Sequence, residues 1–169
     1  MKTFLVAILL TLGMAGLVEA QQCPDVVSGT TTYTCTTTVF NDSGSTLTSG
    51  TVVVWDSADT DFSTTGYPYV ITSTTADDPY TAGVMQTGSC LDQSLCAIVT
   101  RGFTDVLIAN STDDTAEDTQ IGTTTVAGQA GDYATGANTC TLGTLVSYHS
   151  ADTAVNSLLG RVFVDIDCD

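Results

Sequence analysis

The stretch TTTYTCTTTVF, residues 30–40, alternates with a period of two. In an extended chain Tyr33, Cys35, Thr37 and Val39 share one face, and the branched Cβ atoms of the threonines suit a pleated surface. The same period recurs along most of the chain, whereas the 3.6-residue period of a helix is nearly absent. The stretch therefore predicts a β-strand in an all-β protein.

Outward from this strand, residues 41–50 (NDSGSTLTSG) are typical of a turn, and TVVVW, residues 51–55, is a continuous apolar run that predicts a buried strand. A short helix or a loop is expected only at residues 151–160. Further strands are predicted at residues 69–75, 83–87, 97–102, 104–109, 123–128, 143–149 and 160–168. We therefore expect a single all-β domain, a sandwich or barrel of about nine or more short strands.

Residues 1–20 have the pattern of a cleaved secretory signal peptide. Lys2 is followed by an apolar run over residues 4–17, and Val18 and Ala20 are the small residues that a signal peptidase requires. The remaining residues, 21–169, form the predicted secreted domain, located outside the cell or at its surface. No second apolar run approaches the length of a membrane span, so no membrane insertion is expected.

Charge is the most unusual property of this chain, whose net charge is −16. After the signal peptide there is no lysine, and Arg101 and Arg161 are the only arginines. Proteins that bind nucleic acid use basic side chains to neutralise phosphates, so a nucleic-acid partner is excluded. The acidic surface serves solubility or is bridged by cations such as Ca²⁺.

All cysteines lie after the signal peptide, and an even number in an exported chain predicts three disulfides. Cys90 and Cys96 bracket a short loop, which favours a local disulfide between them. Proximity in the sequence suggests the pairs Cys23 with Cys35 and Cys140 with Cys168. Because the chain has no CxxC motif and only one histidine, zinc binding and redox catalysis are disfavoured.

Acidic clusters are the candidate Ca²⁺ sites, although none completes an EF-hand loop and each also fits a solvated surface. They comprise Asp56, Asp59 and Asp61; Asp113, Asp114, Glu117 and Asp118; and Asp165, Asp167 and Asp169. Two sequons, at Asn41 and Asn110, are candidate glycosylation sites if the host modifies such motifs.

Catalytic residues are not expected. His149 is the single histidine, and no nucleophile motif accompanies it. A glycosidase could use two carboxylates, but Trp55 is the only tryptophan that could help to form a sugar platform. We therefore expect a protein that is not an enzyme and that has no cofactor other than Ca²⁺.

Four segments carry a resemblance to a known group of proteins. They are Ala82-Gly83-Val84, residues 101–108 (RGFTDVLI), residues 121–130 (IGTTTVAGQA) and residues 160–164 (GRVFV), within residues 50–166. In this order they resemble the small β proteins that decorate or cement phage capsids, and related surface-fibre domains. The resemblance implies a β-barrel that packs against copies of itself or a lattice. The signal peptide and the cysteines depart from that pattern.

Strand edges give the functional hypothesis. Secreted β proteins guard their edges with lysine, proline or bulges, and this chain has no lysine after Lys2 and few prolines. Residues 21–40 and 160–169 are the candidates to pair with another copy. We therefore expect a structural subunit of an extracellular filament, tube, sheath or coat, whose partners are copies of itself or lattice components. The alternatives are an adhesion or carbohydrate-binding module and a hydrolase that uses carboxylates.

Overall fold

A computed structural model of the chain describes residues 34–58, 65–86, 88–109, 118–134, 138–152 and 157–168. These residues form an all-β fold, which confirms the predicted class. No helix among them has the length and hydropathy to cross a membrane. The strands are β1 (Thr34–Asn41), β2 (Leu47–Thr48), β3 (Val52–Trp55), β4 (Tyr69–Ile71), β5 (Thr81–Met85), β6 (Ser89–Cys90), β7 (Leu95–Ala109), β8 (Gln120–Thr123), β9 (Ala130–Asp132), β10 (Cys140–Asp152) and β11 (Ser157–Cys168).

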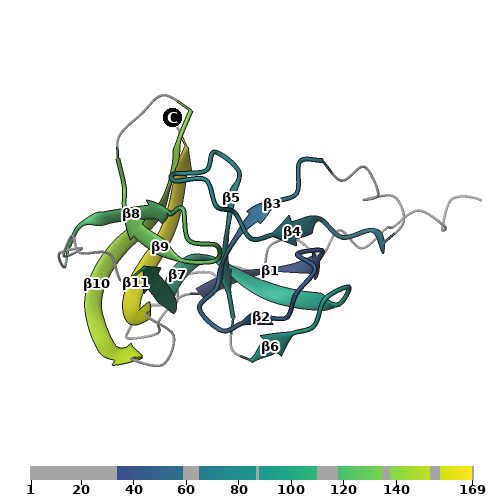
Figure 1. Ribbon diagram of the computed structural model, residues 1–169, viewed down its shortest axis with the longest axis horizontal. Coiled ribbons are helices and arrows are strands. Elements are labelled where there is room, and N and C mark those ends of the chain that lie inside the picture. The colour runs from purple at the N-terminus through teal and green to yellow at the C-terminus, as the bar shows by residue number, and fades with distance from the viewer. Residues whose placement is uncertain are drawn as a thin grey trace, which may run out of the picture.

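Nine of these strands form one sheet that closes on itself twice. The first ring runs through β1, β4, β3, β5 and β7, because β1 pairs with both β4 and β7. The second ring runs through β7, β11, β10, β8 and β9, because β9 pairs with both β8 and β7. Both rings therefore share β7. Figure 1 shows the first ring on the right and the second, with the curved β10 and β11, on the left.

The long strand β7 makes this double closure possible. Its first half, from Leu95 to Gly102, pairs with β1, and its second half, from Arg101 to Ala109, pairs with β11. Gly102 lies where the two halves meet and has a φ of +107°. Sequence analysis predicted two separate strands here. The structure corrects this to one strand of 15 residues.

Two hydrophobic cores lie on opposite faces of the wall formed by β3, β5 and β7. Val52, Val84 and Val99 belong to the core of the second ring. Their immediate neighbours Val53, Met85 and Ile98 belong to the core of the first ring. A strand that is buried on both faces needs consecutive apolar residues, since successive side chains point in opposite directions. This explains the TVVVW run, whose predicted burial is confirmed.

The close approach of β5 to β7 in this wall requires a glycine. A Cβ on Gly83 would lie 2.4 Å from the carbonyl oxygen of Val99, and the φ of Gly83 is +154°. A larger residue would separate the two strands.

Residues 151–160, expected to be a short helix or a loop, belong at both ends to a β-hairpin. Strand β10 extends to Asp152 and β11 begins at Ser157. The register pairs Asp152 with Ser157 and Cys140 with Cys168. The expectation of a helix is therefore wrong at both ends of this segment, where ladder pairing with a long partner strand outweighs the local capping signals.

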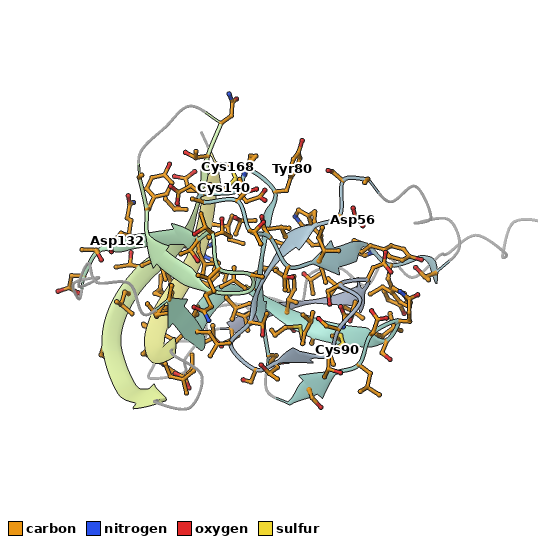
Figure 2. All side chains as sticks on the ribbon, viewed as in Figure 1. Asp56, Tyr80, Cys90, Asp132, Cys140 and Cys168 are labelled. Carbon is orange, nitrogen blue, oxygen red and sulfur yellow. A yellow bond between two sulfur atoms is a disulfide. The ribbon has the colours of Figure 1, made fainter. Side chains whose placement is uncertain are left out.

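Two disulfides join the cysteines that sequence proximity had paired. Cys90–Cys96 closes the turn between β6 and β7, and Cys140–Cys168 joins the beginning of β10 to the end of β11. Figure 2 shows the latter pair at the top of the second ring. Cys35 is also disulfide-bonded, while its expected partner Cys23 lies outside the described residues.

Candidate functional site

The C-terminal strand is not available for pairing along most of its length. From Ser157 to Asp165, β11 pairs with β7 on one side, and from Ser157 to Cys168 it pairs with β10 on the other. The expectation that residues 160–169 pair with a neighbouring copy is therefore wrong for residues 160–165, which have a strand partner on both sides. A C-terminal strand need not lie at an edge, and here ring closure places it in the middle of a sheet.

Two other stretches of strand have one side without a strand partner among the described residues. In β1, residues 34–39 pair with β7, whereas β4 meets this strand only at Phe40 and Asn41. In β10, the side opposite β11 pairs with β8 at Gly143 and Thr144 only. Leu145 makes two further backbone hydrogen bonds. Its N–H donates to the carbonyl oxygen of Thr119, and its carbonyl oxygen accepts from the N–H of Asp118.

Beyond Leu145 the outer side of β10 is the longer of the two candidate edges. It comprises residues 146–152, VSYHSAD, which contain no lysine and no proline. Val146 is 38 % exposed. Register shifts near Leu145 and Tyr148 curve the strand without closing this side. We call residues 146–152 the β10 edge.

The loop closed by the Cys90–Cys96 disulfide is braced against the turn after β1. Asn41 is fully buried, and its Nδ2 donates to the carbonyl oxygens of Ser45, Cys90 and Leu91 at 2.9, 3.2 and 3.1 Å. Its Oδ1 accepts from the backbone N–H of Ser43 at 3.0 Å. The loop is therefore rigid and presents Leu91 and Leu95 to solvent.

This network leaves no room for the glycan expected at Asn41. A glycan would be attached to Nδ2, which the fold buries and uses for three hydrogen bonds. The folded domain therefore contradicts modification at Asn41, because the sequon pattern carries no information on burial. The second sequon, at Asn110, lies outside the described residues.

The predicted Ca²⁺ sites are only partly covered by the described residues. Asp56 follows β3, where its Oδ1 accepts from the N–H of Ala58 at 2.9 Å; Asp59 and Asp61 lie outside the described residues. Asp165 and Asp167 are both exposed on β11. In the part of the chain that is described, no group of three or more acidic, histidine or cysteine side chains is placed to hold a metal ion.

Of the remaining acidic cluster, Asp118 alone falls in the described residues, in the turn before β8, while Asp113, Asp114 and Glu117 do not. The last member of the C-terminal cluster, Asp169, is also outside them.

A buried acidic pair that sequence analysis did not single out joins the two rings. Asp77 and Asp78 lie in the loop between β4 and β5, yet their backbone N–H groups donate to Thr123 of β8, at 2.9 Å to the carbonyl oxygen and 2.6 Å to Oγ1. Asp78 also accepts from Ser73 and Tyr80. The loop of the first ring is thereby fixed to the second.

The side chain of Asp77 accepts fewer hydrogen bonds than the side chain of Asp78. Asp77 is 5 % exposed and adopts a positive φ of 51°. Its Oδ2 accepts from the N–H of Ala134 at 3.0 Å, whereas its buried Oδ1 has no hydrogen-bond partner. Burial raises the pKa of Asp77 above the usual value, and the Ala134 hydrogen bond opposes that rise. The sequence Asp77-Asp78-Pro79 is typical of an exposed turn and gives no indication that these carboxylates are buried.

His149 belongs to β10, but its side chain is outside the described part. No protein-family model matches the chain, and no curated protein is significantly similar to it.

Proposed function

We propose that this protein is a secreted, non-enzymatic structural subunit that assembles with copies of itself into an extracellular filament, tube, sheath or coat. The observation that carries the proposal is the β10 edge. Its backbone donors and acceptors lie along a strand with no described partner on one side, and, although two register shifts bend this strand, it contains neither of the residues, lysine and proline, that natural proteins also use to prevent pairing.

Other features of the chain support the same function. The signal-like segment of residues 1–20 directs the chain to an oxidising compartment, where the disulfides form. Both rings are closed, so strand addition has few alternative places among the described residues. The resemblance to capsid-decorating β proteins has the same implication.

Net charge sets the condition for assembly. Copies that each carry −16 repel one another, and salt or divalent cations screen this repulsion. Assembly is therefore expected to increase with ionic strength and with Ca²⁺, even without a dedicated ion site.

Electron microscopy of the purified, non-reduced protein tests the proposal, with and without millimolar Ca²⁺. We expect ordered polymers. The variant Val146→Lys places a charged side chain on the β10 edge, which opposes strand pairing, and it should abolish the polymers. Val126→Lys is the matched control, because Val126 is similarly exposed, at 46 % against 38 %, but lies in the turn after β8.

Two results would contradict the proposal. Dispersed wild-type monomers under every condition would exclude self-assembly, and saturable glycan binding by those monomers would favour an adhesion module. Polymers that persist in Val146→Lys as in Val126→Lys would show that the β10 edge is not the contact.

A further inference from the structure

Both arginines of the secreted part lie on one small surface, the outer face of β7 and β11. The register pairs Arg101 with Asp165, Phe103 with Phe163, and Asp105 with Arg161. Between them Gly102, Val162 and Val164 are buried on the inner face, and Thr104 is half-buried there. These six outward residues form three successive rows, which we call the β7–β11 ladder.

Contacts within the ladder hold its side chains in place. Arg101 Nε lies 3.4 Å from Asp165 Oδ1, and Arg161 Nη1 donates to Asp105 Oδ1 at 3.2 Å. The rings of Phe103 and Phe163 meet edge to face at 5.0 Å, and the Arg161 guanidinium carbon is 6.0 Å from the Phe103 centroid. Edge-to-face rings with a cation above them form a favourable apolar centre.

The charged side chains of the ladder nevertheless remain open to solvent. The exposed fractions are 64 % for Arg101, 58 % for Asp165, 37 % for Arg161 and 46 % for Asp105. Exposed pairs of this kind contribute little to folding stability.

Charge alternates across the ladder in both directions. Along β7 the order is Arg101, Phe103, Asp105, and along β11 the matching rows carry Asp165, Phe163, Arg161. A two-fold axis lying in this face brings a second ladder onto the first. If the axis runs along the strands, Arg101 faces Asp165 of the other copy. If it runs across them, Arg101 faces Asp105. In both arrangements every charge meets its opposite and the phenylalanines meet at the centre.

We propose that the β7–β11 ladder is a two-fold interface between two copies of this chain. An isologous interface must be complementary to itself, and the ladder satisfies this in charge and in its aromatic centre. The protein has a net charge of −16, but the two arginines and two aspartates of the ladder sum to zero, so the ladder itself adds no net repulsion between two copies. Its flanks on β10, Thr144 and Ser147, are small and uncharged.

This inference rests on the proposed self-assembly and adds a second contact to it. A two-fold contact alone gives only dimers, whereas a dimer that also exposes two β10 edges can be extended in both directions. The ladder would then set the repeating unit, and the β10 edge would join the units.

Reciprocal charge reversal tests the interface by sedimentation velocity at about 0.15 M ionic strength, where charges more than roughly 8 Å apart are screened. All proteins in this test carry Val146→Lys, which blocks extension through the β10 edge, and the protein with an otherwise wild-type sequence should show a concentration-dependent dimer. Arg101→Asp and Asp165→Arg should each raise the dimer dissociation constant roughly tenfold or more, because like charges then face each other. Asp132→Arg, an exposed residue of β9 on the left in Figure 2, is the control and should dimerise as the otherwise wild-type protein does.

Mixing the variants identifies the axis. An equimolar mixture of Arg101→Asp with Asp165→Arg should restore the dimer if the axis runs along the strands. A mixture of Arg101→Asp with Asp105→Arg should restore it if the axis runs across them. Each mixed pair has the same total charge as two otherwise wild-type copies, so rescue reports facing residues and also shows that the variants are folded.

Three outcomes would overturn the interface. If Arg101→Asp and Asp165→Arg each dimerise as strongly as the protein without these changes, the ladder is not the interface, and the proposed function is unaffected. Loss of dimers that neither mixture restores would also exclude it. Wild-type protein that stays monomeric throughout would overturn both the interface and the proposed function.

Discussion

The side-chain amide of Asn41 donates a hydrogen bond to the carbonyl oxygen of Cys90, 49 residues further along the chain, at 3.2 Å. This bond ties the end of β1 to the disulfide loop before β7, and further bonds from the same amide reach Ser45 and Leu91. One buried side chain therefore replaces the strand pairing that these turns lack.

Replacing Asn41 with alanine should lower the free energy of unfolding by about 2–3 kcal/mol, since buried carbonyl groups lose their donor. Urea denaturation measures the loss. Ser43→Ala is the matched control: it removes the same sequon but leaves the Asn41 donors in place, and should change stability by less than about 0.5 kcal/mol. Equal losses in the two variants would contradict the role of the network. Intact protein from a glycosylating host should carry no glycan at Asn41.

Sequence patterns predicted a strand correctly where the pattern of apolar residues matches the burial of that strand in the fold. The TVVVW run is buried on both faces, as a continuous apolar stretch indicates. The alternation of residues 34–40 matches β1. Prediction failed at residues 123–128, where only Thr123 belongs to β8 and the following residues turn. Threonine and valine favour a strand locally, but the chain must reverse here to close the second ring.

Long-range relationships could not be predicted from local patterns. Gly102 interrupts the apolar pattern and indicates a break, whereas the structure uses its positive φ to continue β7 from one ring into the other. The β7–β11 ladder depends on register between strands more than 50 residues apart, as the 56-residue separation of Arg161 and Asp105 shows. The sequence shows that Arg101 and Arg161 are the only arginines, but no local pattern places them on one face.

The two described disulfides should differ in their contribution to stability. Cys140–Cys168 spans 28 residues and Cys90–Cys96 spans 6. The loop-entropy relation gives about 3.6 kcal/mol for the longer loop and about 2.2 kcal/mol for the shorter one. Double alanine variants of each pair, compared by urea denaturation under non-reducing conditions, should show the larger loss for Cys140→Ala/Cys168→Ala. A larger loss for Cys90→Ala/Cys96→Ala would mean that the hydrogen bonds around the Cys90–Cys96 loop matter more for stability than loop length does.

Acidification should relieve the cost of burying Asp77. Because burial raises its folded-state pKa above the usual 3.8, the folded domain binds this proton more readily than the unfolded chain does. The favourable contribution is complete below the unfolded pKa and is lost as the pH rises through the folded pKa. The variant Asp77→Asn has no carboxyl group at this position and should lack this pH-dependent contribution to stability. The difference in Tm between wild type and Asp77→Asn should therefore shift in favour of wild type as the pH falls from 7 towards 4.

The control for this titration is Asp132→Asn, which alters an exposed carboxylate of β9. Its Tm should follow the wild-type pH profile. A constant difference between wild type and Asp77→Asn at every pH would show that Asp77 does not titrate differently in the folded domain.

Gly143 should tolerate no side chain, because β10 and β11 approach each other closely at this position. An added Cβ would lie 2.1 Å from the carbonyl oxygen of Phe163, and the φ of Gly143 is +152°. At Gly44 the φ is +71° and an added Cβ would meet nothing within 4 Å. Gly44→Ala carries backbone strain alone and should cost about 1 kcal/mol.

Gly143→Ala combines the same kind of strain with a backbone collision that forces the two strands apart. It should cost about 3 kcal/mol or more, in the range that marks a structural disruption. Urea midpoints for the two variants measure this difference directly. Because β11 also carries Phe163 and Asp165 of the ladder, Gly143→Ala should weaken dimerisation as well, whereas Gly44→Ala should not. Equal losses of stability in the two variants would show that the hairpin can open at Gly143 without cost to the second ring.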